Sequence, residues 1–269
     1  MGWSADNIPS LAGRLALVTG ANVGLGLETT RQLARKGARV VMACRDQLKA
    51  EAARQQLLDE GCADLETLAL DLGDLTSVQD GIERLQQRHT QLDVLINNAG
   101  VMAPPRRLSP QGYEWQLAVN HLGHMALTLG FLPMMTTGAD PRVVTVTSGA
   151  QYFGQIRWDD PNWQESYNRY GAYSQSKLAN VMFALELEAR LREQNSPVQS
   201  LAAHPGLAKT NLQPTALASA GQPLEALSYQ LMGPLFQPPE MGALPQLYAA
   251  TAPSAQGGEH YGPNQFGGL

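Results

Sequence analysis

The feature that most limits the possible folds is an alternation of short apolar runs with longer helical patterns. Six such runs, each bounded by polar or turn residues, occupy residues 15–19, 39–43, 65–70, 93–97, 142–147 and 198–203. Runs of this kind are typical of strands buried on both faces, and their alternation with helices favours parallel strands with right-handed crossovers. We therefore predict an α/β fold in which one doubly wound parallel sheet carries helices on both faces, with residues 1–269 forming a single domain.

Residues that end helices agree with this division of the chain. The predicted helices at 25–36 and 47–60 are followed by Gly37 and Gly61. Glycine is favoured just beyond a helix because it adopts a left-handed conformation at little cost. A third helical stretch, at 173–194, contains neither glycine nor proline, and we predict one long helix there.

The segment at 207–239 differs from the rest of the chain. It is rich in Leu, Ala, Pro and Gly, and no strand pattern runs through it. Its apolar side chains suit a lid over a lipophilic substrate, and they suit packing against the core or a second subunit equally well. We predict that this segment covers the substrate.

Composition excludes several classes of protein. The net charge is −5, 43% of the residues are hydrophobic and only 16% are charged, which indicates a globular protein without the basic surface that nucleic acids require. No stretch reaches the ~18–20 apolar residues that span a bilayer, and the first ten residues lack the pattern of a signal peptide. We therefore expect a cytoplasmic protein with no membrane anchor and no nucleic-acid partner.

Cysteines and histidines give no sign of a metal site. The two cysteines, Cys44 and Cys62, have neither metal-ligand spacing nor the pattern of a disulfide framework. His121, His124 and His204 have no cysteine or carboxylate at the spacing that metal ligands need, so we interpret them as structural.

A glycine-rich loop joins the first predicted strand to the first predicted helix. It reads Thr19-Gly20-Ala21-Asn22-Val23-Gly24-Leu25-Gly26. The glycines leave room for a pyrophosphate near the backbone, and the amino terminus of the helix supplies free N–H groups and a positive dipole. A tight turn without a ligand is the alternative. The position between a strand and a helix favours a dinucleotide site, with contacts from Gly20, Asn22, Gly24, Leu25 and Gly26.

Residues after the second predicted strand bear on the choice of dinucleotide. A fold that prefers NAD usually places a carboxylate here to bind the ribose 2′-hydroxyl, whereas this chain reads Ala43-Cys44-Arg45-Asp46. Arg45 can pair with a 2′-phosphate through charge-assisted hydrogen bonds. Asp46 would bind the ribose if it turned inward, but we interpret it as the cap of the helix that follows, as Asp74 caps the next. We predict NADP(H), with NAD(H) as the alternative.

Tyr173 and Lys177 form the candidate catalytic pair. A spacing of four residues places both side chains on one face of a helix. A nearby ammonium favours tyrosinate, so Tyr173 can exchange a proton with a carbonyl or an alcohol. Ser148 ends the fifth predicted strand, where its hydroxyl can hold the substrate oxygen. The alternative is an ordinary solvated helix face, because the chain contains 8 tyrosines and the spacing alone is a weak signal.

In combination, these motifs resemble the short-chain dehydrogenase/reductase family, which has a Rossmann fold. The resemblance spans about residues 13–262 and includes the loop at 19–26, Asn97-Asn98-Ala99-Gly100, Asn120, Ser148, Tyr173 with Lys177, and His204-Pro205-Gly206 with Thr210. Three segments, at 42–46, 119–124 and 173–181, look like the branch of retinol dehydrogenases and the WW-domain oxidoreductase, with protochlorophyllide reductase a more distant relative. That branch favours NADP(H), which agrees with the interpretation of Arg45.

The sequence departs from this branch at two places. Thr147 stands where the family often has a first serine, which should leave Ser148 unaffected. The apolar amino-terminal anchor of membrane-bound retinol dehydrogenases is not found, which weakens any transfer of retinoid specificity. The helix after Tyr173 faces a partner in many members, so the resemblance also implies a homo-oligomer.

The resemblance implies a role for each matched residue. Tyr173 is the acid/base, Lys177 holds the ribose hydroxyls and tunes Tyr173, and Ser148 positions the carbonyl oxygen. Asn120 holds a water in a proton relay to Lys177, or else satisfies backbone groups within its helix. For the cofactor, Asp71 would meet the adenine, or else be a simple turn residue. Asn97 and Gly100 would line the adenosine ribose side, and Thr210 would bind the carboxamide or the phosphates. Further implied cofactor contacts, without a more specific role, are Leu72, Ala99, Pro205 and Gly206.

The sequence as a whole predicts an NADP(H)-dependent oxidoreductase. Its substrate would be a small-molecule carbonyl or alcohol, whose identity and direction of conversion the sequence does not specify. Reduction of a carbon–carbon double bond uses the same side chains and is one alternative. A non-catalytic NADP(H)-sensing protein is another, although such a protein would have no need to retain Ser148, Tyr173 and Lys177 together.

Overall fold

One parallel sheet forms the centre of the computed structural model, which describes residues 2–206 and 237–263. Within these residues, seven strands lie in the order β3-β2-β1-β4-β5-β6-β7, and every pair is parallel. The strands are β1 (Leu15–Thr19), β2 (Arg39–Cys44), β3 (Leu65–Ala69), β4 (Val94–Asn97), β5 (Arg142–Val146), β6 (Gln199–Ala203) and β7 (His260–Tyr261). The six predicted strands are confirmed to within one residue at each end. The seventh was not predicted, because a strand of two residues has no recognisable pattern.

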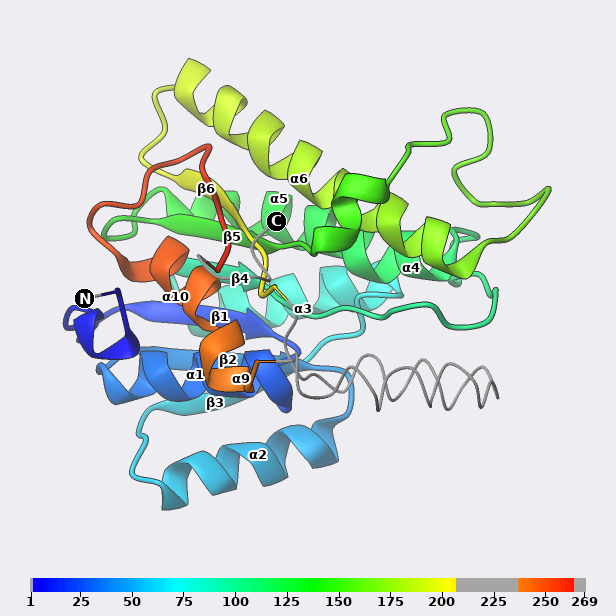
Figure 1. Ribbon diagram of the computed structural model, residues 1–269. Coiled ribbons are helices and arrows are strands. Elements are labelled where there is room, and N and C mark those ends of the chain that lie inside the picture. Colours follow the sequence, from blue (N-terminus) through cyan, green and yellow to red (C-terminus); the bar gives the residue numbers. More distant parts are fainter. Residues whose placement is uncertain (1, 207–236, 264–269) are drawn as a thin grey trace.

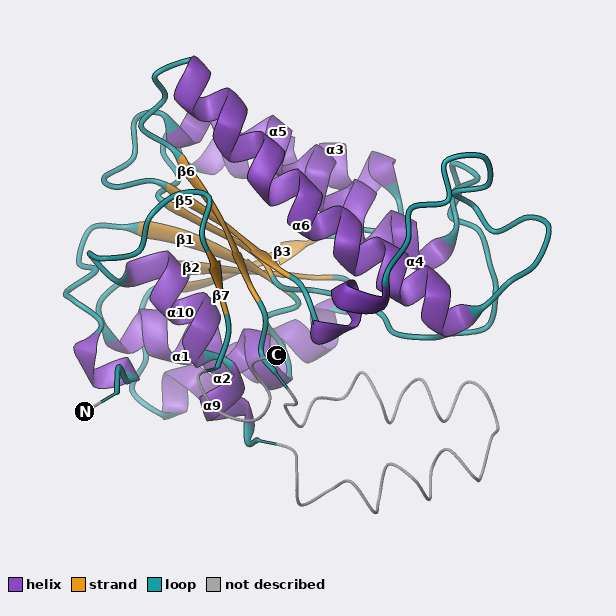
Figure 2. Ribbon diagram, turned by 45° about the horizontal axis from the view of Figure 1, so that its top comes forward, coloured by secondary structure: helices purple, strands orange, loops and turns teal. Residues whose placement is uncertain are grey.

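Helices cover both faces of the sheet, as predicted (Figures 1 and 2). On one side lie α1 (Gly24–Arg35), α2 (Gln47–Asp59), α9 (Pro239–Gly242) and α10 (Leu244–Thr251). On the other lie α3 (Leu75–Arg88), α5 (Gly123–Met135) and α6 (Arg169–Glu193), with the short α4 (Trp115–Leu117) near the start of α6. The doubly wound α/β fold is therefore confirmed.

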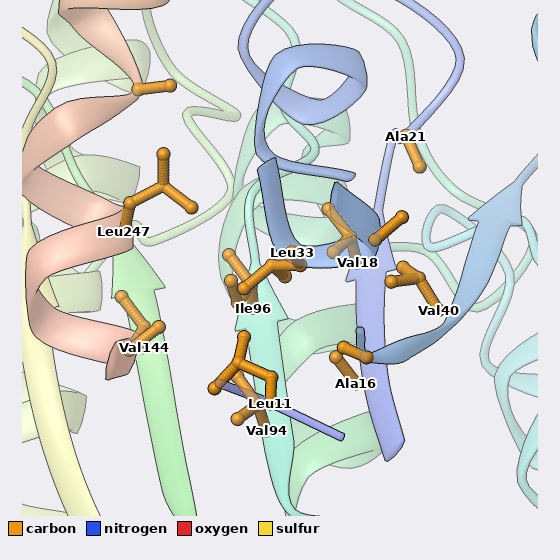
Figure 3. Close-up of a cluster of buried hydrophobic side chains, with 14 of the residues drawn as sticks. Leu11, Ala16, Val18, Ala21, Leu33, Val40, Val94, Ile96, Val144 and Leu247 are labelled. Atoms are coloured by element: carbon orange, nitrogen blue, oxygen red, sulfur yellow. The ribbon is translucent and has the colours of Figure 1, made fainter. Parts of the chain in front are cut away.

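Alternation within the strands divides the core into two layers. In β1, Leu15 and Leu17 belong to the cluster beneath α3, α5 and α6, whereas Ala16 and Val18 belong to the cluster beneath α1, α2 and α10. Figure 3 shows the second cluster, with Leu33 of α1 close to Val18. Because successive side chains of a strand point to opposite faces, an unbroken apolar run buries both faces at once.

Most of the predicted helix ends are confirmed. Asp46 accepts a hydrogen bond from the Lys49 amide at 3.1 Å and caps α2, and Asp74 accepts one from the Thr76 amide at 3.0 Å and caps α3. Gly37 and Gly61 follow α1 and α2 with φ of 91° and 87°, the left-handed conformation that ends a helix.

The predicted start of α6 (Arg169–Glu193) was wrong. The helix begins at Arg169, four residues before the predicted start, because the Asn168 side chain accepts hydrogen bonds from the amides of Tyr170 and Gly171 and caps it. Gly171 falls in the first turn, where a Cβ would overlap the ring of Trp163.

Most of the predicted substrate-covering segment, residues 207–236, lies outside the described residues. Gln237 follows it, and its side-chain amide donates to the Pro205 carbonyl at 3.4 Å. Within residues 2–206 and 237–263, no helix combines the length and hydrophobicity needed to cross a bilayer.

Candidate active site

The predicted site residues gather where the strands end. Thr19 ends β1, Asn97 ends β4, and Ser148 lies two residues beyond β5. In a parallel sheet all carboxyl ends lie along one edge, where ligands bind in folds of this class. The helix α6 packs along β5 and brings Tyr173 and Lys177 to the same edge.

Tyr173 and Lys177 are buried together on one face of α6. Their exposed fractions are 6% and 3%, and the Lys177 Nζ lies 5.9 Å from the centre of the Tyr173 ring. A solvated helix face, the alternative that the spacing left open, is therefore excluded. Lys177 Nζ donates to the Val146 carbonyl at 3.1 Å, which anchors it at the end of β5.

Burial dominates the ionisation of the pair. Loss of water lowers the pKa of Lys177 to about 8. Burial also raises the pKa of Tyr173, and a hydrogen bond with the Ser148 side chain lowers it. The sequence led us to expect that Lys177 would lower the pKa of Tyr173. Desolvation has the larger effect and raises this pKa, and the Lys177 ammonium is directed at the Val146 carbonyl.

Ser148 begins the 3₁₀ helix η3 (Gly149–Phe153), and its hydroxyl accepts a hydrogen bond from the Ala150 amide at 3.3 Å. The neighbouring Thr147 is 2% exposed. Its Oγ1 lies 2.5 Å from Gln151 Oε1 and 3.0 Å from the Lys177 carbonyl oxygen. The departure at Thr147 thus ties β5 to α6 and leaves Ser148 beside Tyr173.

Asn120 lies in a π-helical turn, η2 (Ala118–Leu122), and is fully buried. Its Oδ1 accepts from the Val101 amide at 2.8 Å, and its Nδ2 donates to the Val101 carbonyl and to Ser176 Oγ, both at 2.9 Å. A Cβ on Gly100 would lie 3.2 Å from Asn120 Oδ1 and 3.6 Å from Lys177 Nζ. Asn120 and Lys177 therefore converge on the space beside Gly100.

The glycine-rich loop has the backbone shape that its sequence predicts. Gly20 and Gly24 have φ of 65° and 54°, which side chains rarely adopt. A Cβ on Gly26 would overlap the Gly20 carbonyl and the Asn98 side chain. The loop delivers the chain to the amino terminus of α1, with Leu25 buried and Asn22 half-buried.

Two polar residues that hold this loop were not predicted. Thr19 Oγ1 accepts hydrogen bonds from the amides of Asn98 and Ala99, both at 2.9 Å, and Asn98 Nδ2 donates to the Thr19 carbonyl at 2.8 Å. These bonds join the end of β1 to the segment after β4. Both residues belong to recognised motifs, but a contact between positions 79 residues apart leaves no local pattern.

Not every predicted side chain faces this edge. Asn97 is fully buried, and its Nδ2 donates to Thr128 of α5 at 2.8 Å.

The segment after β6 contains three further predicted cofactor contacts. Gly206 has φ of 65°, and its amide donates a hydrogen bond to His204 Nδ1 at 3.2 Å. Pro205 is half-buried beside it, and Thr210 lies outside the described residues.

Arg45 and Asp46 differ in their surroundings at the end of β2. The Asp46 carboxylate faces α2, where it caps the helix and lies 3.2 Å from Lys49 Nζ. Arg45 is exposed. Asp46 is therefore not directed at a ribose here.

Asp71 and Leu72 follow β3. Asp71 Oδ1 accepts from the Gly73 amide at 2.9 Å, which forms a tight turn, and its own amide donates to Ser77 Oγ at 3.0 Å. Leu72 is 6% exposed. Asp71 thus has the turn geometry that the sequence left as its alternative, and it remains half-buried at the same edge of the sheet.

Comparison with known proteins identifies the family of this chain. Residues 14–220 match the family model described as short chain dehydrogenase. The chain belongs to this family. Retinol dehydrogenase 14 of Mus musculus is 40% identical over 264 residues, which cover 93% of this chain and 78% of that protein. The resemblance to the retinol dehydrogenase branch is therefore confirmed.

Solved structures agree with this membership of the short-chain dehydrogenases. The crystal structure of an uncharacterized protein from Mycobacterium paratuberculosis superimposes with a TM-score of 0.80 and 43% identity, covering 100% of this chain and 87% of that one. An NAD(P)-dependent gluconate 5-dehydrogenase from Beutenbergia cavernae, solved with bound NADP at low occupancy, gives a TM-score of 0.73 and 26% identity over 94% of this chain and 96% of that one.

Proposed function

We propose that this short-chain dehydrogenase uses NADP(H) to interconvert an aldehyde or ketone with the corresponding alcohol. The observation that carries the proposal is the burial of Tyr173 and Lys177 beside Ser148 at the end of β5. Burying a lysine costs stability, and perturbed ionisable groups of this kind concentrate at functional sites. A protein that only sensed NADP(H) would have no reason to retain such a group.

Residues at the strand ends fit a nicotinamide dinucleotide. Gly20 and Gly24 leave the backbone bare at the amino terminus of α1, which suits a pyrophosphate. Gly100 leaves space beside Lys177 Nζ for the ribose hydroxyls. The preference for NADP(H) over NAD(H) rests on Arg45, because the neighbouring carboxylate of Asp46 is engaged as a helix cap. The bound NADP of the Beutenbergia cavernae relative is consistent with it.

Three side chains account for the chemistry. The nicotinamide supplies or accepts the hydride when it is bound. Tyr173 donates its phenolic proton to the substrate oxygen during reduction and accepts a proton during oxidation. The Ser148 hydroxyl donates a hydrogen bond to the same oxygen. Lys177, charged below about pH 8, stabilises the tyrosinate as it forms.

Asn120 suits the relay role in one respect. Its Oδ1 accepts a single hydrogen bond, from Val101, and an amide oxygen has a second lone pair. That lone pair can hold a water between Asn120 and Lys177, through which Tyr173 would be reprotonated.

The remaining features complete the proposal. Residues 1–269 act as one domain, residues 207–239 cover the substrate, Thr210 binds the nicotinamide side of the cofactor, and the protein works in the cytoplasm as a homo-oligomer. The similarity to retinol dehydrogenase 14 makes a lipophilic carbonyl, retinal included, the first substrate class to test.

The test is consumption of NADPH and NADH with a panel of aldehydes, ketones, enones and retinal. Tyr173→Phe should lower kcat by about 10²-fold or more, since general acid–base catalysis contributes about that much. Tyr248→Phe is the matched control. It removes the same atom from a tyrosine of α10 whose hydroxyl lies 2.8 Å from Ser254 Oγ and which the proposed site does not include, so this variant should retain activity. Unchanged activity of Tyr173→Phe would refute its role, NADH preference would refute the cofactor assignment, and saturation of enones alone would favour double-bond reduction.

A further inference from the structure

Arg107 is held over an aromatic ring in the loop that follows β4. Its guanidinium carbon lies 3.5 Å from the centre of the Trp115 ring, and Trp115 itself is 7% exposed. The backbone fixes the same geometry, because the Trp115 amide donates to the Arg107 carbonyl at 3.0 Å. Stacking on a buried indole restricts the arginine to a small range of positions.

The position of Trp115 places Arg107 at the adenosine end of the proposed cofactor site. A Cβ on Gly73 would overlap the Trp115 ring, so the ring lies directly against the turn after β3. That turn contains Asp71, and β3 pairs with β2, which Arg45 follows directly. Arg107 therefore comes from a distant loop to the edge where β2 and β3 end.

The charges at this edge are unbalanced. Burial lowers the pKa of Arg107, the positive charge of Arg45 lowers it further, and Asp71 opposes both. Within residues 2–206 and 237–263, neither Arg45 nor Arg107 makes an ion pair or a side-chain hydrogen bond. The adjacent Arg106, by contrast, donates to the carbonyls of Trp163 and Asn162 at 3.0 and 3.3 Å.

We propose that Arg107 is a second cation of the 2′-phosphate site, acting together with Arg45. The inference rests on the proposed NADP(H) function and adds a residue that the sequence did not indicate. A phosphate between two guanidiniums would relieve their mutual repulsion, and both forks would be free to donate. Trp115 holds Arg107 in place, so little side-chain entropy is lost when the phosphate binds.

The test is calorimetric titration of the full-length protein with NADPH, NADH and 2′,5′-ADP. These probes separate the 2′-phosphate from the rest of the dinucleotide. Arg107→Gln should weaken NADPH and 2′,5′-ADP by about tenfold or more, the range for a charge-assisted hydrogen bond, and NADH by less than about threefold. Arg106→Gln is the matched control, since it removes the same charge one residue away and should leave all three affinities within about threefold.

Two results would overturn the role of Arg107. Equal weakening of NADPH and NADH would mean that it contacts the shared adenosine, and unchanged NADPH binding would mean that it makes no contact. A wild-type protein that binds NADPH no more tightly than NADH would instead refute the NADP(H) preference itself. Melting temperatures of each variant, measured without ligand, show that the fold is retained.

Discussion

Replacing Lys177 by Met tests the link between burial and ionisation in the active site. Lys177 is 3% exposed, and its pKa is lowered from 10.5 to about 8. In this pH range the unfolded chain binds a proton that the folded protein releases, so the free energy of unfolding rises with pH. At ~1.4 kcal/mol per pKa unit, Lys177 should add about 2 kcal/mol of stability between about pH 7.5 and 9.5.

Lys177→Met should disturb the surrounding structure little. Methionine is similar in length and apolar, and the Val146 carbonyl still accepts a hydrogen bond from Asn180 Nδ2 at 3.2 Å. Lys177→Met removes the pH-dependent gain, so the difference in stability between the variant and the wild type should shift by about 2 kcal/mol over that pH range.

Urea unfolding at the two pH values, without cofactor, measures this shift. Lys49→Met is the control, because the Lys49 side chain is 72% exposed and should show no such pH dependence relative to wild type. A stability difference between Lys177→Met and wild type that is the same at both pH values would show that burial does not lower the pKa of Lys177. Lys177 would then stay charged throughout this pH range.

Two further predictions concern the cap at the end of β2 and the core. Asp46→Ser keeps a side chain that can cap α2, so the free energy of unfolding should change by less than about 1 kcal/mol. Because we interpret Asp46 as a cap and not as a ribose ligand, the ratio of NADPH to NADH affinity should be unchanged. A shift of that ratio toward NADPH would mean that Asp46 contacts the ribose. Phe131→Ala should lower the free energy of unfolding, measured in urea, by about 3–5 kcal/mol, because Phe131 of α5 is fully buried in the core cluster on that side of the sheet. Leu129→Ala, on the same helix but 50% exposed, should cost far less, and equal losses would contradict the assignment of the core.

Much of the fold follows from local patterns. The strand β1 was predicted at its observed bounds because an apolar run of that length fits a doubly buried strand and little else. Asp46 and Asp74 were predicted as caps because they precede helical patterns directly. The start of α6 escaped prediction because Gly171 suggests a break, and only the packing of Trp163 against it explains a glycine there.

The candidate site was predictable to the extent that its residues form motifs. Tyr173, Lys177 and Ser148 were found from spacing and from position at a strand end, and the glycines of the loop from their place between a strand and a helix. The contact of Asn97 with the adenosine ribose side of the cofactor stays a prediction, and its side chain donates a hydrogen bond to Thr128 within the core. A motif reports that a residue matters and does not report which way its side chain points.

The sequence by itself determined the order of strands and helices along the chain, the glycine-rich loop, the candidate pair Tyr173 and Lys177, and the family. All of these depend on residues close together along the chain. Only the tertiary structure decided that Lys177 is buried against Val146, that Thr19 holds the segment after β4, and that Arg107 stacks on Trp115 near Arg45. The physical reason is that desolvation, hydrogen bonding and charge repulsion depend on distance in space, and folding brings together residues whose separation in sequence carries no signal.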